Sequence, residues 1–390
     1  MNMRLSAIFF SALISLGCGS SGLDVVRAQQ HPDVRPTPES SQDLITIAAV
    51  GDIMLASPFP NDTRMPPKDG ADLLKPVTAI LSAADIAFGN MEGPITDGGI
   101  SQKCEPKPSL PKPVDAKPID AKPSVPKPKE PVRCYAFRMP TRYGKYLRAA
   151  GFDVLSLANN HALDFGNPGR TSTRKVLDEL SIKHAGSDRL KYSTTYLEVK
   201  GRKVAFVGFA HNSLVPNVND LATAKRLVAE AAKKADIVVV SFHGGGEGIA
   251  AQNVPKETEL YFGEKRGNLP LFARTVIDAG ADLVLGHGPH VLRGMEIYKD
   301  RLIAYSLGNF ATYGWFKLEA ETALTMILEA RVGYDGKFLG GRIHSGRQEG
   351  WGGPVLDPTN EAVKKVRSLS MADFGSSAPA IADDGTITPK

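Results

Sequence analysis

Six short polar motifs follow apolar, strand-like runs along this sequence. Polar side chains at the carboxyl ends of neighbouring buried strands meet in one crevice of an α/β sheet. The side chains in these motifs include Asp, Glu, Asn and His, a set that suits divalent metal ions. The motifs therefore predict the chemistry of a site more clearly than they predict a substrate. They occupy residues 50–54, 88–93, 157–166, 240–248, 285–290 and 305–310.

Two acids and an Asn–His pair come from the first half of the chain. Asp52 and Glu92 each follow a predicted strand, although an acid at such a place also commonly completes a turn. Asn160 and His161 are a stronger signal, because an amide oxygen and a neutral imidazole both coordinate divalent ions. Asp164, three residues after the histidine, is placed to orient the imidazole. The alternative is a helix start capped by Asn160.

Three histidines end apolar runs in the second half of the chain. His243 is followed by three glycines, which let the backbone approach another group closely. His287 and His290 end the next apolar run. A lone buried His is more often a core residue than a ligand, but His at several strand ends, together with two acids, favours one shared site. His211 lacks this context and stays outside the predicted set.

The predicted roles fall into three groups. The expected metal ligands are Asp52, Glu92, Asn160, His243, His287 and His290. The expected general acids are His161 and His287. The side chains expected to orient ligands or to contact substrate are Asn90, Asn159, Asp164, Glu247 and Asn309. The expected cofactor is one or two ions of manganese, iron or zinc. Two ions about 3.5–4 Å apart would ligate a phosphoryl oxygen, and Glu92 would bridge them.

Several other catalytic classes lack their motifs. The sequence contains no HExxH, no Cys pairs with zinc-ribbon spacing and no GxSxG. It also contains neither a P-loop nor a GxGxxG that follows a strand and precedes a distant acid. These absences exclude zincin, zinc-finger and α/β-hydrolase interpretations and leave little support for a nucleotide-binding fold.

The apolar periodicity predicts an α/β domain. Strands are expected at residues 44–55, 85–89, 152–158, 237–242 and 282–285, hairpins at 196–209 and 295–305, and late antiparallel strands at 322–331 and 337–344. Helices are expected at residues 71–84, 141–150, 173–180 and 221–234, with another that Pro270 opens and Gly280 closes. Early βαβ units and later hairpins favour mixed sheets, either one sheet or two packed sheets with helices outside. The domain is expected over residues 44–350, followed by an extension, 351–390, that frays from about residue 371.

The N-terminus has the features of an export signal. Arg4 precedes an apolar stretch, residues 5–16, that is too short to span a bilayer, and small residues lead to a cleavage site after Ala28. The rival interpretation is cleavage before a lipidated Cys18. Both place the protein outside the cytoplasmic membrane or in the periplasm, and no later run is long enough for a membrane span. Residues 29–43 are polar and Pro-rich, which predicts a disordered leader.

A Pro/Lys-rich insert lies between Cys104 and Cys134. In an oxidising compartment these two cysteines are expected to form a disulfide. The insert contains seven Lys or Arg against four Asp or Glu, so it supplies +3 of the net charge of +5. Because the folded remainder is nearly neutral, no nucleic-acid partner is expected. The insert is either a solvated surface decoration or a site where Lys residues hold a polyanion.

The six motifs together resemble the CapA family, which is named for poly-γ-glutamate capsule synthesis. The resemblance runs over residues 45–310, interrupted by the insert, and is closest over 156–166 and 280–310. That family is similar to calcineurin-like metallophosphoesterases. The resemblance implies an α/β, metallophosphoesterase-like sandwich of mixed sheets flanked by helices, with a two-metal centre.

The resemblance also carries functional residues onto this chain. The positions that match the metal-binding motifs are Asp52, Asn160, His161, His243, His287 and His290. Glu92 stands near the expected bridging Asp. Met54 stands where the superfamily has a His, so one ligand is missing, and Gly288 replaces a His common in the family itself.

Two functions are compatible with these residues. The first is an exported, metal-dependent phosphoesterase-like hydrolase or transferase that acts on a phosphoester or an anionic cell-surface polymer, together with membrane-bound capsule synthesis proteins. The alternative is a non-catalytic component that holds a polyanion such as poly-γ-glutamate during export or anchoring. The retained histidines favour the first function and Met54 favours the second.

Overall fold

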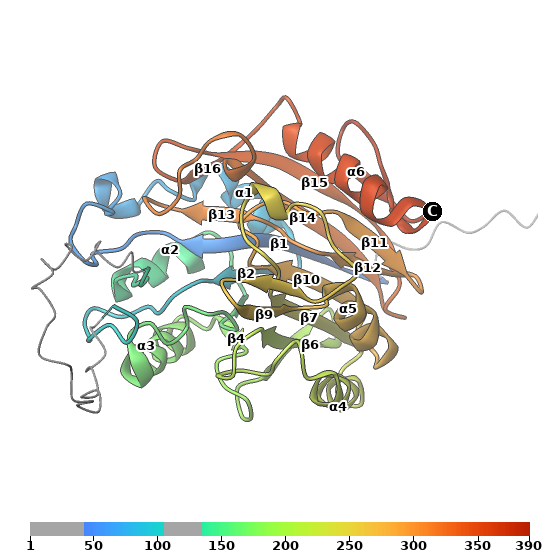
Figure 1. Ribbon diagram of the computed structural model, residues 1–390, viewed down its shortest axis with the longest axis horizontal. Helices are drawn as coiled ribbons and strands as arrows, with labels where there is room; N and C mark the ends of the chain where they lie inside the picture. The colour runs from blue at the N-terminus through green and yellow to red at the C-terminus, as the bar shows by residue number, and fades with distance from the viewer. Residues whose placement is uncertain (1–42, 105–134) are drawn as a thin grey trace, which may run out of the picture. The chain divides into compact units, whose positions relative to one another are not determined.

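A computed structural model describes residues 43–104 and 135–390 of the chain (Figure 1). The predicted signal peptide, almost all of the predicted leader and the insert with Cys134 lie outside these residues, so the export signal and the disulfide stay predictions. Within the described residues, no helix combines the length and the apolar character needed to cross a membrane.

The larger sheet has ten strands and joins a parallel half to an antiparallel half. The strand order is β17-β18-β15-β14-β1-β2-β3-β4, with β13 beside β1 and β16 beside β15. The parallel strands are β1 (Leu44–Met54), β2 (Ile86–Met91), β3 (Val154–Ser156), β4 (Lys183–Ala185) and β13 (Asn309–Thr312). The antiparallel strands are β14 (Leu324–Gly333), β15 (Phe338–Glu349), β16 (Gly353–Leu356), β17 (Ala380–Ile381) and β18 (Thr386–Thr388).

The smaller sheet has six strands in the order β11-β12-β10-β7-β6-β5. Its four central strands run parallel, and a hairpin closes each edge. The strands are β5 (Thr194–Val199), β6 (Arg202–Ala210), β7 (Ile237–His243), β10 (Leu283–His287), β11 (Met295–Tyr298) and β12 (Arg301–Ala304). A separate short hairpin pairs β8 (Glu259–Tyr261) with β9 (Glu264–Gly267).

The two sheets pack face to face, and helices cover their outer faces. Alternate residues of each strand point to opposite sides, so Ile45 and Ile47 of β1 enter the core between the sheets while Val50 packs under the outer helices. The rings of Phe88 and Phe206 stack across the interface with centroids 5.3 Å apart. The mixed-sheet α/β sandwich predicted from the sequence is therefore confirmed.

Each helix covers one part of this sandwich (Figure 1). The larger sheet is covered by α1 (Lys75–Ala83), α2 (Gly144–Ala149) and α3 (Gly166–Glu179). The smaller sheet is covered by α4 (Leu221–Ala232) and α5 (Leu269–Asp278), while α6 (Glu361–Phe374) packs against β15 and β11. Pro270 lies in the first turn of α5 as predicted, and Asn268 caps it by accepting from the Leu271 amide.

The predicted frayed tail is wrong. Helix α6 continues to Phe374, whose ring stacks on Tyr305 with centroids 4.8 Å apart. Beyond it, β18 pairs with β15, and Ile387 is fully buried. The composition of the tail is small and polar, but two isolated isoleucines, Ile381 and Ile387, fill the core beside α6. Isolated apolar residues give too weak a periodic signal to predict strands of two and three residues.

The strand register brings distant motifs together at one edge of the sandwich. On the larger sheet Asp52 of β1 lies opposite Asn90 of β2 and opposite Asn309 of β13. On the smaller sheet His243 of β7 lies opposite His287 of β10. Asn309 begins β13, and the other four residues lie within two residues of the carboxyl end of a parallel strand, which is where α/β folds place ligands.

A glycine is required where the chain before β13 crosses the end of β1. A Cβ atom on Gly51 would lie 2.0 Å from the carbonyl oxygen of Gly308, far inside contact distance. The absence of that atom lets the Asp52 amide donate to the same carbonyl at 3.0 Å. The backbone therefore fixes the position of the Asp52 side chain.

Candidate metal centre

Two carboxylates and one imidazole meet at the edge where the strands of both sheets end. Ligand atoms of Asp52, Glu92 and His290 all lie within 4.8 Å of one another, and all three residues are buried. The Nδ1 atom of His290 lies 3.1 Å from Oδ2 of Asp52. The other carboxylate oxygen of Asp52 accepts a hydrogen bond of 2.7 Å from the Asn90 amide. Asp52 is therefore held in place with one oxygen directed at the cluster.

Glu92 lies at the centre of a ring of imidazoles. Its Oε1 atom is 3.9 Å from Nε2 of His161 and 3.8 Å from Nε2 of both His243 and His290. These separations are too long for hydrogen bonds. Among the described residues, neither oxygen of Glu92 nor Nε2 of His243 has a hydrogen-bond partner. Buried polar atoms without partners are costly, so this group lacks something that would satisfy it.

A divalent ion fits what this group lacks. Ligand atoms bound at about 2.0–2.2 Å from one ion lie roughly 3–4 Å apart, and the separations around Glu92 fall in that range. The donors are carboxylate oxygens and imidazole nitrogens, which suit manganese, iron and zinc. The residues present therefore fit a metal ion.

Burial and mutual charge alter the protonation of the cluster. Burial, together with the negative charge of Asp52, raises the pKa of Glu92 well above its usual range. Burial lowers the pKa of His243 well below its usual range, and nearby histidines and Arg266 act in the same direction. For His290 burial also lowers the pKa, but the carboxylates of Glu92 and Asp52 outweigh it and raise the pKa to about 10. Without a metal ion, these carboxylates rely on a protonated His290 for positive charge.

His161 is oriented by the residues that follow it. Its Nδ1 atom lies 2.7 Å from Oδ2 of Asp164, and the same oxygen accepts from the Phe137 amide at 2.8 Å. Because a carboxylate only accepts, Nδ1 donates and Nε2 keeps its lone pair on the side of Glu92. Burial lowers the pKa of His161, although Asp164 opposes that effect. A neutral Nε2 is suited to bind metal or to accept a proton.

Two neighbouring asparagines have different surroundings. Both polar atoms of the Asn159 side chain form hydrogen bonds within the protein. The amide nitrogen donates to Asn90 and to the Met91 carbonyl, and the oxygen accepts from the His161 amide. Asn160 lines the cavity beside the cluster, and its buried Oδ1 has no hydrogen-bond partner in the part of the chain that the structure describes. Asn160 therefore offers an oxygen to an ion or a ligand, whereas Asn159 fixes the chain around it.

His287 occupies a different position from the other histidines. It is fully buried, and its Nε2 donates to the carbonyl oxygen of Val50 at 3.2 Å. The ring also lies beside Phe88, with centroids 5.9 Å apart. A nitrogen that donates to a carbonyl has no free lone pair, so Nδ1 is the ligand atom that His287 has left. Its predicted roles as a ligand and a general acid stay predictions.

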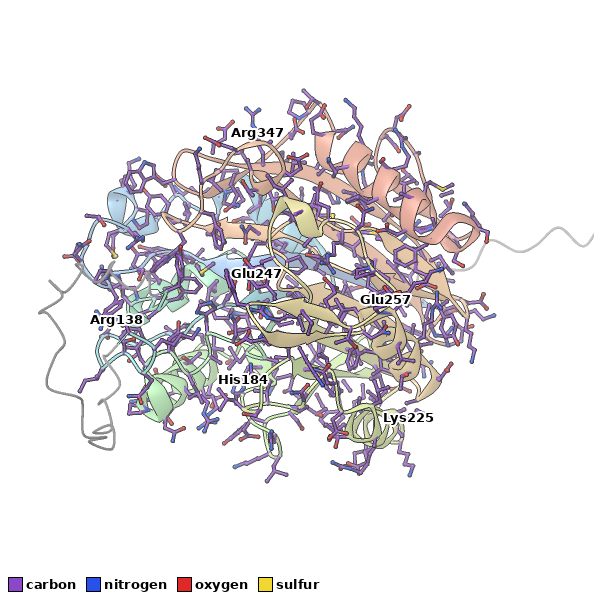
Figure 2. All side chains as sticks on the ribbon, in the orientation of Figure 1. Arg138, His184, Lys225, Glu247, Glu257 and Arg347 are labelled. Atoms are coloured by element: carbon purple, nitrogen blue, oxygen red, sulfur yellow. The ribbon has the colours of Figure 1, made fainter. Side chains whose placement is uncertain are left out.

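The remaining predicted residues lie around the cluster. The side-chain oxygen of Asn309 is 3.0 Å from Nδ1 of His290 and so helps to orient that ring. Glu247, labelled in Figure 2, follows β7 and lies 2.9 Å from Arg266. His290 itself has a positive φ of 59°, a backbone conformation that is unfavourable outside glycine and occurs at functional sites.

Lys103 belongs to the site although no sequence motif points to it. Its ammonium group lies 2.9 Å from Asp164 and 3.1 Å from Nδ1 of His161. A lysine at the start of a charged, Pro-rich segment looks like a solvated residue, so local pattern could not reveal this contact. His211 lies outside the cluster, with its Nδ1 3.3 Å from the His243 carbonyl oxygen. Burial and the charge of Arg266 lower the pKa of His211 to about 4.

A cavity of about 660 Å³ opens beside the cluster. Its walls combine His161 and His290 with cationic and aromatic side chains. The lining residues are Lys103, Tyr135, Phe137, Asn160, His161, Glu247, Tyr261, Phe262, Arg266, His290, Trp315, Phe316 and Lys317.

The six motifs and the strand edge that they form coincide with a known family. The family described as bacterial capsule synthesis protein PGA_cap matches residues 46–313, a range that contains every residue of the cluster. The chain belongs to this family. The resemblance to CapA proteins is thereby confirmed.

Relatives within the family carry capsule-related names. The chain is 32% identical over 292 residues to the PGA biosynthesis protein CapA of Bacillus subtilis (strain 168), covering 70% of this chain and 65% of that protein. It is 29% identical over 309 residues to the capsule biosynthesis protein CapA of Bacillus anthracis, covering 74% of this chain and 64% of that one. The chain thus spans slightly less than two thirds of the length of these relatives.

Solved structures show weaker likeness. A hypothetical protein from Thermus thermophilus gives a TM-score of 0.44 at 17% identity, covering 77% of this chain and 98% of that one. The NAD nucleotidase of Haemophilus influenzae gives a TM-score of 0.30 at 15% identity, covering 63% of this chain and 45% of that one. At these scores neither protein carries an argument about this one.

Proposed function

We propose that this chain is an exported, metal-dependent phosphoesterase-like hydrolase or transferase in the synthesis of poly-γ-glutamate or another cell-surface polymer. The observation that carries the proposal is the buried Glu92, whose Oε1 faces three imidazole nitrogens at 3.8–3.9 Å with Asp52 beside them. Membership of the capsule synthesis family supports the biological setting.

The residues that would hold the metal are Asp52, Glu92, His243 and His290, with Asn160 and His161 at the edge of the group. When bound, a divalent ion would supply Lewis-acid polarisation of a phosphoryl oxygen. Position 54 carries Met instead of His, and the metal content of the purified chain will distinguish one bound ion from two. Met54 is 2% exposed and packs in β1.

The chain itself supplies proton transfer and binding of the anion. His161 presents Nε2 on the side of Glu92, while Asp164 accepts from its Nδ1 and Lys103 holds Asp164 in place through an ion pair. A positioned imidazole contributes roughly 10²–10⁴-fold to proton-transfer catalysis. Lys103, Arg266 and Lys317 line the cavity beside one acid, Glu247, so cations outnumber acids on its walls, which favours an anionic substrate. Each of these cations also pairs with a carboxylate of the chain.

Export and partners are part of the same proposal. The export proposal rests on residues 1–28, with lipidation of Cys18 as the alternative route. Outside the cytoplasmic membrane the substrate would be an anionic cell-surface polymer or a phosphoester, and the partners would be membrane-bound capsule synthesis proteins. The names of the Bacillus relatives support this setting.

A second candidate function is polyanion binding without catalysis. It is favoured by Met54, which stands where a metal-binding His is expected, and by the cations that line the cavity. In that case the same site would hold poly-γ-glutamate during export or anchoring.

The test begins with the metal content of the purified chain and continues with hydrolysis of bis(p-nitrophenyl) phosphate in added manganese. The proposal expects stoichiometric metal and turnover that falls at least about 100-fold in His161→Ala. His287→Ala is measured in the same assay, because Nε2 of His287 donates to the Val50 carbonyl and only Nδ1 is left to bind metal. His344→Ala is the matched control, because His344 pairs with Glu329 on the antiparallel half of the larger sheet. Polymer binding without turnover would support the second function, and turnover that survives in His161→Ala would contradict the first.

A further inference from the structure

The cavity beside the metal cluster is unusually rich in aromatic side chains. Aromatic residues make up 7% of the chain, yet six of the thirteen residues that line the cavity are aromatic. They come from separate segments of the sequence, so the concentration is a product of the fold. They are Tyr135, Phe137, Tyr261, Phe262, Trp315 and Phe316.

The inner aromatic residues support the metal ligands. Phe137 stacks on His161 with ring centroids 3.8 Å apart and an interplanar angle of 22°. Phe316 lies against His290 with centroids 4.6 Å apart. Trp315 packs on Phe137, and its indole Nε1 is buried with no hydrogen-bond partner within the described ranges. These rings fix the imidazoles, and the indole has a donor left over for a ligand.

The outer aromatic residues have no such structural task. Phe262 is 90% exposed and Tyr135 is 54% exposed. Phe262 sits at the tip of the β8–β9 hairpin, where its φ is +46° and that of Gly263 is +79°. Turns with two positive φ values normally carry Asn-Gly or Asp-Gly, because a bulky side chain is unfavourable there. Phe262 is therefore both exposed and conformationally disfavoured, and folding does not explain it.

The hairpin that carries Phe262 is held firmly beside the cavity. The fully buried Arg293 forms two hydrogen bonds with Glu259 of β8, at 2.8 and 2.7 Å. Arg293 follows His290 by three residues, so one short segment fixes both the metal cluster and the hairpin. On the next strand, Arg266 lies 5.2 Å below the ring of Tyr261. The aromatic tip is thus held beside the cavity by Arg293 and Arg266.

We propose that this cavity binds a phosphoester that carries a planar ring, with the ring against Phe262 and Tyr261 and the phosphate at the metal cluster. The inference rests on the proposed function and names the class of its substrate. The volume of about 660 Å³ is typical of a site for a small organic ligand. Lys103 and Lys317 on the walls match the charge of the phosphate. A chain of glutamates has no ring, so polymer binding alone would leave the aromatic walls unexplained.

A matched pair of ligands tests the inference. Adenosine 5′-monophosphate and ribose 5-phosphate share the sugar and the phosphate and differ by the planar base. The chain contains two tryptophans, and Trp351 does not line the cavity. In the full chain with Trp351→Phe and added manganese, Trp315 fluorescence therefore reports binding at the site. Stacking of a base on an aromatic side chain predicts that the adenosine ester binds roughly 5- to 150-fold more tightly.

Phe262→Asn provides the decisive variant, because Asn suits the turn and removes the ring. It is expected to keep or raise the unfolding temperature, to weaken binding of the adenosine ester at least threefold and to leave the affinity for ribose 5-phosphate unchanged. Phe262→Trp is expected to restore the preference. Equal affinities in the parent chain, no binding of either ester, or a preference that Phe262→Asn does not change would each overturn the inference.

Phosphate release from both esters separates this inference from the proposed function. Preference for the adenosine ester without release of phosphate from either would reject hydrolysis and keep the ring site. Equal binding of both esters with equal release of phosphate would keep hydrolysis and reject the ring site.

Discussion

Replacing Glu92 with Gln is expected to change stability in opposite directions with and without metal. Burial and the charge of Asp52 raise the pKa of Glu92, so an ionised Glu92 destabilises the metal-free fold at neutral pH. The Gln side chain has the same shape and no charge. The metal-free variant is therefore expected to unfold at the same temperature as the parent chain or a higher one.

With metal the order reverses, and the size of the effect follows from linkage. An ion present at 100 times its dissociation constant stabilises the folded chain by about 2.7 kcal/mol. For a large domain this corresponds to roughly 5 °C in the unfolding temperature. If Glu92→Gln weakens binding by about 100-fold, the same ion concentration contributes only about 0.4 kcal/mol, or less than about 1 °C.

The assay is thermal unfolding of the full chain with chelator and with manganese, together with calorimetric titration of the metal. The matched control is Glu257→Gln, because Glu257 is exposed (Figure 2) and its substitution should leave both temperatures unchanged. Equal manganese affinity in Glu92→Gln and in the parent chain would refute the assignment of Glu92 as a ligand. A large loss of stability without metal would show instead that the carboxylate has a structural role.

Three further predictions concern residues outside the metal cluster. Burial lowers the pKa of His184 (labelled in Figure 2), although Asp178 opposes it, so below about pH 6.5 the unfolded chain binds a proton at this residue more readily than the folded chain. Urea unfolding should therefore show a smaller loss of stability from pH 7 to pH 5 in His184→Gln than in the parent chain. Equal losses of stability in the two chains would contradict this. Arg293→Ala removes the cation that pairs with the buried Glu259 carboxylate and leaves it, among the described residues, only the hydrogen bond from the Gly246 amide, so it should cost about 3–5 kcal/mol in denaturant unfolding. Proteolysis of the β8–β9 hairpin should also become faster, and an unchanged cleavage rate would show that the pair does not hold the hairpin. Ile387→Ala should cost about 2–4 kcal/mol because the side chain is fully buried, and a change near zero would mean that β18 is not part of the core.

Much of the sandwich could be predicted because its strands are long apolar runs. Strands β1 and β7 are buried along nearly their whole length, and each carries a polar residue at or near its carboxyl end, Asp52 and His243, that stands out from the apolar run before it. Within each sheet, parallel strands place such residues at one edge, so this part could be predicted. The meeting of Asp52 with His243 also requires the two sheets to pack on each other, because the two residues belong to different sheets.

The unpredicted parts depend on contacts between distant segments. The hydrogen bond from His287 Nε2 to the Val50 carbonyl forms only because one sheet packs on the other. The β8–β9 hairpin has strands of three and four residues, which are too short to show alternation. Lys103 contacts Asp164, a residue far from it in the sequence, so no local pattern encodes the contact.

The contact between His287 and Val50 joins positions 237 residues apart in the sequence. Contacts between such distant residues form slowly, because the chain loses conformational entropy on closing the loop before the contact stabilises it. The pocket around Glu92 draws on both sheets, so neither half of the polypeptide can assemble it alone. If the site takes up a metal ion, that uptake is therefore expected late in folding, after the two sheets have come together.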